Sequence, residues 1–97
     1  MIKRIVRMRF RKQNVPRFLE IFRESCDAIR AFEGCRYLEL LQDQNDPATY
    51  FTISIWETPQ ALEAYRKSDL FAKTWRKTKQ LFKKPAKAWS TTSYLVV

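Results

Sequence analysis

The chain contains no histidine and only one glycine, Gly34, among its 97 residues. The absence of histidine removes the commonest general base near neutral pH and nearly every ordinary zinc site. A single glycine excludes phosphate-binding loops of the P-loop and dinucleotide types, because those loops need several glycines. Any chemistry of this protein must therefore proceed without imidazole and without a glycine-rich phosphate loop.

Cysteine is also scarce, since Cys26 and Cys35 are the only two and have no Cys-x-x-Cys spacing. We interpret both as small buried apolar residues rather than redox groups or metal ligands. No segment approaches the roughly 20 apolar residues of a membrane span, and the N-terminus lacks the apolar region of a signal peptide. We therefore expect a cytoplasmic protein without a membrane partner.

The composition is that of a folded domain, with 45% hydrophobic and 14% aromatic residues. No linker-like stretch interrupts the chain, so residues 1–97 are expected to form a single domain. A chain of this length buries only about 60–65% of the surface that its unfolded form exposes. We therefore expect a thin core that benefits from a partner subunit.

Alternating apolar residues predict strands over residues 2–10, 35–42, 50–56 and 88–97. A first helix is expected to begin at Asn14, as its N-cap, and to end at Gly34, which suits a left-handed C-cap. A second helical region is expected from Pro59 to about Phe82. The order is β-α-β-β-α-β, an α+β, ferredoxin-like arrangement with an antiparallel sheet.

Cap signals divide the second helical region. Thr58 before Pro59 is a good N-cap, and Ser68 followed by Asp69 is another, so the helix is expected to bend or restart there. Two helices can cover only one face of a four-stranded sheet. The strands are nevertheless apolar on both sides, with Leu38 and Leu40 opposite Tyr37 and Leu41 and with Trp89 and Leu95 opposite Tyr94 and Val96. We therefore expect the helix-free faces of two subunits to pack together as a homodimer.

Positive charge dominates, with 19 Lys and Arg residues against 10 Asp and Glu and a net charge of +9. Nine of the basic residues lie between Arg66 and Lys87, where the only acidic residue is Asp69. We interpret this run as a solvated face whose late basic residues complement the helix dipole. The alternative is a positive field that attracts an anionic ligand or nucleic acid.

The segment from Tyr50 to Trp75 resembles a known family. Its strand ends in Ser-Ile-Trp-Glu-Thr-Pro and continues as Ala-Leu-Glu-Ala-Tyr-Arg-Lys-Ser-Asp-Leu-Phe. This pattern is similar to that of the antibiotic biosynthesis monooxygenase (ABM) superfamily, whose members are small dimeric α+β barrels. The order of elements fits that superfamily along the whole chain, so the resemblance implies a dimeric barrel.

The resemblance argues against the heme-degrading branch of the superfamily. That branch has a heme-ligating histidine at the position of Trp75 and a tryptophan at the position of Tyr65. It also uses an asparagine on the first strand, whereas Asn14 and Asn45 are here a cap and a loop residue. Trp75 cannot ligate iron, so we do not expect heme chemistry.

The branch that oxidises quinols and anthrones fits better. Its members use no metal or flavin, so the resemblance implies no cofactor and a reaction between dioxygen and the anion of a small aromatic molecule. Family pockets lie between the sheet and the second helical region, which directs attention to Tyr65 and Trp75 as catalytic residues. Arg66 or Lys79 could stabilise a phenolate. The expected substrate-binding residues are Trp56, Ser68, Phe71 and Trp89.

Two other functions stay open. The stripe of Phe71, Trp75, Thr78 and Phe82 is also what a packed core would show, so a non-catalytic dimeric module that binds a small molecule is the first alternative. The second is RNA binding, with bases stacked on Tyr50 and Trp56 and phosphates on Arg7 and Arg9. The third strand lacks the glycine and aromatic spacing of the RNA-recognition module, which argues against nucleic acid as a partner.

Overall fold

The computed structural model describes residues 1–97 and contains four strands and four helical segments. No helix is long and apolar enough to cross a bilayer. The element order and the restart of the second helical region agree with the prediction. In chain order the elements are β1 (Ile2–Phe10), the 3-10 helix η1 (Lys12–Asn14), α1 (Val15–Arg30), β2 (Cys35–Gln42), β3 (Thr49–Trp56), α2 (Pro59–Arg66), α3 (Asp69–Lys79) and β4 (Phe82–Thr91).

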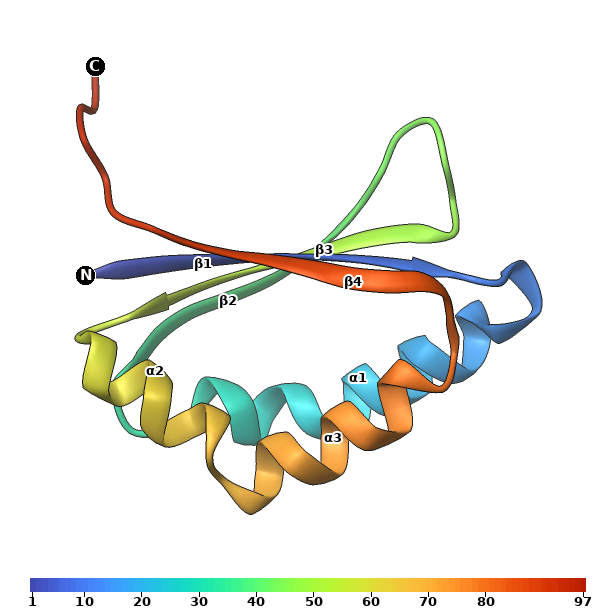
Figure 1. Cartoon of the computed structure of the whole chain (residues 1–97), viewed down its shortest axis with the longest axis horizontal. Helices are drawn as coiled ribbons and strands as arrows, with labels where there is room; N and C mark the ends of the chain where they lie inside the picture. The colour runs from blue at the N-terminus through green and yellow to red at the C-terminus, as the bar shows by residue number, and fades with distance from the viewer.

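The four strands form one antiparallel sheet in the order β2-β3-β1-β4. Figure 1 shows all the helices on one side of this sheet, while the β2–β3 loop and the C-terminal residues rise on the other side. One face of the sheet is therefore covered by helices. We call the opposite one the open face.

The helix boundaries follow local capping chemistry. The Thr58 hydroxyl accepts a hydrogen bond from the Ala61 N–H at 3.0 Å, which confirms it as the N-cap of α2. The Ser68 hydroxyl likewise accepts from the Phe71 N–H at 3.1 Å at the start of α3. Asn14 occupies the N-cap position of α1, but its side-chain amide donates to the Leu81 carbonyl at 3.2 Å instead. The expected side-chain cap at Asn14 is therefore wrong, and the residue ties α1 to the segment before β4.

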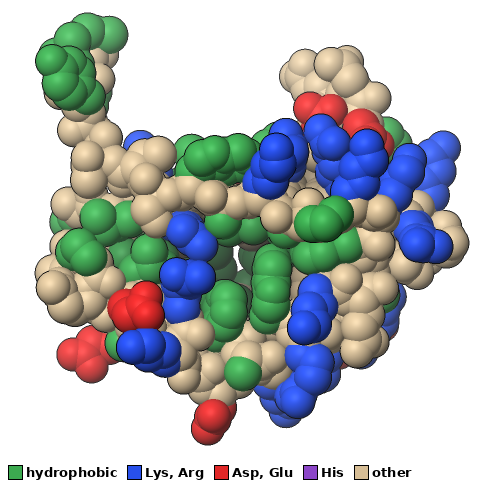
Figure 2. Space-filling view, viewed as in Figure 1, with side chains coloured by type: hydrophobic (Ala, Val, Ile, Leu, Met, Phe, Trp, Pro, Cys, Tyr) green, Lys and Arg blue, Asp and Glu red, His purple; other side chains and the backbone are tan.

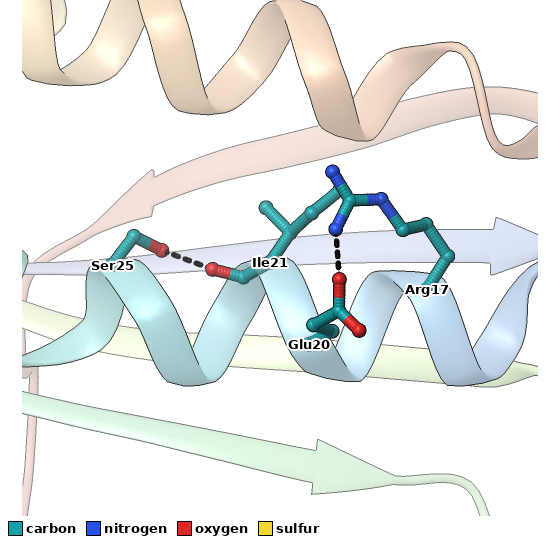
Figure 3. Close-up of polar contacts among 4 residues, drawn as sticks. All are labelled: Arg17, Glu20, Ile21 and Ser25. Atoms are coloured by element: carbon teal, nitrogen blue, oxygen red, sulfur yellow. Dashed lines mark hydrogen bonds and ion pairs between the residues drawn. The ribbon is translucent and has the colours of Figure 1, made fainter.

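Helix α1 presents an apolar stripe to the sheet, with Phe18, Ile21, Ser25 and Ile29 buried. Figure 3 shows how its one buried hydroxyl is satisfied: Ser25 donates to the Ile21 carbonyl at 2.8 Å. The same view shows the ion pair of Arg17 with Glu20 on an outer turn of the helix. The buried hydroxyl of α1 is thus satisfied within the helix and its ion pair lies outside, so the side that faces the sheet stays apolar.

Strand β4 differs from the prediction of residues 88–97. It begins at Phe82, whose ring packs against those of Phe10 and Trp75, with centroids 5.4 Å and 5.5 Å away. Pro85 is tolerated because β4 is an edge strand with a register shift at this level. The strand ends at Thr91 because its partner Lys3 lies almost at the start of β1.

Residues 92–97 therefore lie beyond the sheet. Tyr94, Leu95 and Val96 are exposed and belong to no strand. The expected alternation of Trp89 and Leu95 against Tyr94 and Val96 is wrong for this reason. The apolar residues at the chain end cannot extend β4, because β1 offers them no pairing partner beyond Lys3.

The two faces of the sheet are chemically distinct. Tyr50 and Trp56 are buried on the helix-covered face, where Tyr50 packs against α1 and Trp56 against α2. Arg7 and Arg9 have the opposite parity on β1 and lie on the open face. The RNA-binding arrangement with these aromatic and basic residues side by side is therefore wrong.

The open face carries apolar side chains that nothing in the chain covers. Tyr37, Leu41 and Trp89 are 42%, 36% and 44% exposed. Trp89 lies under the guanidinium of Arg7, which is 5.8 Å from the centre of its ring. The half-buried residues Ile5, Phe51, Ile53 and Ile55 complete the apolar part of this face.

Candidate functional site

A cavity of about 340 Å³ lies between the helix-covered face of the sheet and the helices. Figure 2 shows the hollow opening to solvent, with apolar side chains around it and basic side chains at its rim. Hydrophobic residues make up 13 of the 19 that line it. The 19 lining residues are Arg4, Val6, Met8, Phe18, Phe22, Ile29, Leu38, Thr52, Ser54, Trp56, Leu62, Tyr65, Arg66, Phe71, Thr74, Trp75, Thr78, Ala86 and Ala88.

The strand register builds the floor of the cavity. Arg4 pairs with Ser54 in one row across the sheet, and Val6 pairs with Thr52 and Ala88 in the next. Because both rows have the helix-facing parity, their side chains point into the space beneath α2 and α3. The floor therefore changes from a polar row at Arg4 to a more apolar one at Val6.

Aromatic rings form a continuous wall along the helices. Trp56 stacks on Tyr65 at 4.8 Å, and the edge of Phe71 meets Tyr65 at 5.2 Å. Phe71 stacks on Trp75 at 5.8 Å with an interplanar angle of only 12°. Such contacts hold the rings in defined orientations, so the wall is a preformed surface for a flat apolar ligand.

Tyr65 has the most informative polar group in the cavity. Its hydroxyl makes no hydrogen bond within the chain, although the residue lines the cavity. Burial, with a smaller contribution from the neighbouring Cys35, raises the pKa of Tyr65 to about 12. The phenol is therefore neutral near pH 7 and can donate a hydrogen bond to a bound molecule.

The indole N–H of Trp56 is already hydrogen-bonded within the chain. Its N–H donates to the Ser54 hydroxyl oxygen at 3.0 Å, and the residue is fully buried. The role of Trp56 in the cavity is therefore to hold the ring of Tyr65 in place by stacking. Ser54 still has its own hydroxyl hydrogen, since the contact to Trp56 uses an oxygen lone pair.

Positive charge enters the cavity through Arg4 and Arg66. Nη1 of Arg4 donates to the Ser90 hydroxyl at 2.9 Å. Burial lowers the pKa of Arg4, and the nearby charge of Arg66 lowers it further. No carboxylate lines the cavity, so the two guanidinium groups give it a positive end.

Four of the six predicted site residues line the cavity: Trp56, Tyr65, Phe71 and Trp75. Ser68 does not, because its hydroxyl donates to the Tyr65 carbonyl at 2.6 Å while it caps α3. Trp89 lies on the open face, as the parity of β4 requires. Neither residue is placed to contact a ligand in this cavity.

The charged candidates separate in the same way. Arg66 lines the cavity, whereas Lys79 is exposed and does not. Arg4, Thr52 and Thr74 line it without having been predicted. A signal for the two strand residues existed, since Arg4 and Thr52 are polar at positions whose parity faces the helices. Helix-facing positions of a sheet are usually apolar. Polar residues at such positions therefore indicate that the space between the sheet and the helices is not fully packed.

A second hollow, of about 530 Å³, lies where the β2–β3 loop meets the ends of β1 and β4. Its cations are Arg7, Arg9, Lys12, Lys83 and Lys84. The Thr49 hydroxyl and the Ala48 N–H both donate to Asp46 in this hollow, which lowers the pKa of that carboxyl. The carboxylate is thus used to hold the loop. Only three of the 11 lining residues are hydrophobic, so we take the aromatic cavity as the candidate site.

The chain offers few ligands for a metal ion. No group of three or more His, Cys, Asp or Glu side chains gathers anywhere in the structure. The polar groups that the cavity provides are hydroxyls and guanidiniums. Hydrogen bonding and positive charge are the chemical means available there.

Comparison with known proteins gives the family. The model of the family described as "Antibiotic biosynthesis monooxygenase" matches residues 1–77. No curated protein matches the chain.

Solved structures share the fold at low sequence identity. A crystal structure of an antibiotic biosynthesis monooxygenase superposes with a TM-score of 0.92 and 19% identity, covering 98% of this chain and all (100%) of the other. Rv0793 from Mycobacterium tuberculosis gives a TM-score of 0.90 and 16% identity over 98% of this chain and 96% of its own. A conserved protein from Methanosarcina mazei Go1 gives 0.89 and 16% over 93% and 89%. The match of the family model to residues 1–77, more than half of the chain, shows that the chain belongs to the antibiotic biosynthesis monooxygenase family.

Proposed function

We propose that this protein is a cofactor-independent monooxygenase that oxidises a small aromatic molecule of the quinol or anthrone kind in the aromatic cavity. The observation that carries the proposal is the unpaired, neutral hydroxyl of Tyr65 facing a ring-sized cavity. A hydrogen bond from this hydroxyl to a ring oxygen strengthens as negative charge develops there. Tyr65 would thereby favour the anion of the substrate.

The reaction can be written without an added reductant. The substrate anion gives one electron to dioxygen, and the resulting radical pair joins through a new carbon–oxygen bond. The hydroperoxide then loses water, so that a CH₂ group of an anthrone becomes a ketone. One oxygen atom enters the product and the other leaves as water, and all four electrons come from the substrate.

The protein's share of this reaction is positional and electrostatic. Trp75 and Phe71 would hold the ring, while Tyr65 and the positive end at Arg66 would stabilise the anion. No side chain in the lining can act as a general base near pH 7, so water would take the proton. This limits the proposal to substrates whose anion forms readily.

Oxygen uptake tests the proposal. We expect the purified protein to consume dioxygen with an anthrone or a hydroquinone, and the Tyr65→Phe, Trp75→Ala double variant to lose most of that activity. Lys79→Ala is a matched control, because Lys79 lies on the same helix as Trp75 but outside the cavity. Equal uptake by the wild type and the double variant would contradict the proposal.

The absence of a base in the cavity lining favours one alternative, a non-catalytic module that binds an aromatic molecule. The two functions differ in a single measurement. A binding module would show saturable binding of the same aromatic molecules in calorimetry without any oxygen uptake. Variants at Tyr65 and Trp75 would then change the affinity alone.

We also propose that the protein works as a homodimer in the cytoplasm, with the open faces of two copies in contact. Tyr37, Leu41 and Trp89 lie exposed on that face, and a second copy is the partner that would cover them. Sedimentation at micromolar concentration should give twice the chain mass, and Leu41→Glu should shift it toward the monomer. Ala72→Glu, on the exposed side of α3, is the control. A wild-type monomer under these conditions would contradict the dimer.

A further inference from the structure

Arg4 and Arg66 place two positive charges at one end of an otherwise apolar cavity. The side chain of Arg4 is bonded only to a neutral group, the Ser90 hydroxyl. The nearest carboxylate to Arg66 is that of Glu63 at 3.8 Å, and Lys67 lies closer to the same carboxylate at 3.6 Å. Neither guanidinium therefore has a carboxylate within hydrogen-bonding distance.

Such an arrangement is unfavourable in the unliganded protein. Two like charges repel, and the partial burial of Arg4 removes water that would screen its charge from that of the exposed Arg66. The pKa of Arg4 is lowered by both effects, burial first and Arg66 second. An anion bound between the two groups would reverse both effects.

Complementation of a helix dipole, which is a common reason for a surface cation, explains only one of the two arginines. Arg66 lies in the last turn of α2, where a positive charge complements the helix dipole. Arg4 lies on a central strand with the parity that faces the helices, a position that an apolar side chain normally takes. Its presence there calls for a partner that the chain itself does not supply.

We infer that the substrate of the proposed monooxygenase carries a carboxylate, which Arg4 and Arg66 hold at the polar end of the cavity. This inference rests on the proposed function, because it concerns the same cavity. Guanidinium groups match the two oxygens of a carboxylate with paired hydrogen bonds. A single phenolate oxygen would leave most of the ten N–H groups of two arginines unused.

The strand register sets the dimensions of such a substrate. The rows of Arg4 and Val6 are two residues apart along β1, or about 7 Å. Val6 lines the cavity together with Phe71 and Trp75 of α3. A substrate with its carboxylate at Arg4 and an aromatic ring about 7 Å away would therefore reach the part of the cavity that these residues line.

The test compares two probes that differ in charge alone, 2-naphthoate and 2-naphthamide, by titration calorimetry at low salt. We expect the carboxylate to bind at least about tenfold more tightly than the amide. Arg4→Gln and Arg66→Gln should each remove most of that difference and leave the amide affinity within about twofold. Arg4→Lys should retain part of it, because the charge remains but the paired hydrogen bonds do not.

Lys67→Gln is the matched control. It removes the same charge one residue from Arg66, on a side chain that is 76% exposed and outside the cavity lining. Equal binding of the two probes, or a loss in Lys67→Gln as large as in Arg4→Gln, would overturn the inference while leaving the cavity as an aromatic site. Failure of both probes to bind would overturn the inference and remove the support for the proposed function. Circular dichroism of each variant separates a loss of binding from a loss of folding.

Oxygen uptake then separates the two proposals. Arg4→Gln should lower kcat/KM for oxygen uptake much more with an anthrone that carries a carboxylate than with a neutral anthrone. Equal losses with the two anthrones, together with equal binding of the two naphthalene probes, would mean that Arg4 acts on the reacting ring. The carboxylate would then have no role.

Discussion

The phenol ring of Tyr65 stacks on the indole of Trp56, with 4.8 Å between the ring centroids and 24° between the planes. On another side it meets the edge of Phe71 at 5.2 Å. The ring is thus held between an α3 residue and a β3 residue, while its hydroxyl has no partner in the chain. The fold fixes the position of this hydroxyl and leaves it free to bind.

The hydrogen bond from Trp56 to Ser54 supports this arrangement, and Ser54→Ala should break it. The buried indole N–H would lose its acceptor, which destabilises the protein by about 1–3 kcal/mol. Urea unfolding followed by far-UV circular dichroism measures the change. Adding Trp56→Phe removes the stranded donor, so the effect of Ser54→Ala should be smaller in that background. An unchanged unfolding midpoint in Ser54→Ala would show that the indole finds another acceptor.

The raised pKa of Tyr65 makes part of the stability depend on alkaline pH. Burial favours the neutral phenol in the folded state, so this contribution is complete below the unfolded pKa of about 10 and is lost as the pH rises toward about 12. Titration of tyrosinate absorbance should show a last phase near pH 12 that Tyr65→Phe removes. Tyr94→Phe, at a fully exposed residue, should leave that phase unchanged. Ionisation of Tyr65 with the earlier phases would contradict the burial argument.

Local sequence signals were sufficient for most of the fold. The alternation around Phe51 and Ile53 and the hydroxyl caps at Thr58 and Ser68 act within a few residues of themselves, so they could be read without a partner. The last strand could not be placed in this way. Its limits depend on where β1 begins and on the packing of Phe82 against Phe10, which are contacts between distant parts of the chain.

The candidate site was predictable to the extent that it follows the same rules. Phe71 and Trp75 lie four residues apart, at helical spacing, and the resemblance directs attention to them and to Tyr65. Arg4 was not found, because its role depends on how a β1 side chain meets the end of α2 across the cavity. Trp89 was misplaced for a related reason, since its parity could be assigned only once the pairing of β4 with β1 was known.

The turn after α1 gives a test of backbone strain. Gly34 has a φ of +88°, and a Cβ built there would lie 2.4 Å from the Cβ of Ala61. Gly34→Ala should therefore destabilise the protein by more than about 1 kcal/mol, through both the left-handed backbone and the clash. Ala61→Gly removes the clash but not the strain, so the double variant should recover only part of the loss in thermal unfolding. Full recovery would assign the whole effect to the contact with Ala61.

Substitution of Arg4 is expected to preserve or increase stability, in contrast to Gly34→Ala. Because burial and Arg66 lower the pKa of Arg4, the fold disfavours its charged form, and this penalty persists at every pH below that pKa. Arg4→Gln should therefore keep or raise the free energy of unfolding, by up to about 1 kcal/mol, and less at high salt. Thermal unfolding at two salt concentrations measures it.

Arg36→Gln is the control for Arg4→Gln, because it removes a surface arginine that is paired with Glu57. It should leave stability unchanged or slightly lower, as expected for an exposed ion pair. Residues retained for binding are commonly unfavourable for stability, so a gain in Arg4→Gln together with loss of carboxylate binding would connect the two properties of Arg4. A clear loss of stability in Arg4→Gln would instead mean that Arg4 holds β1 to β4 through Ser90, and the argument for a bound carboxylate would lose its energetic basis.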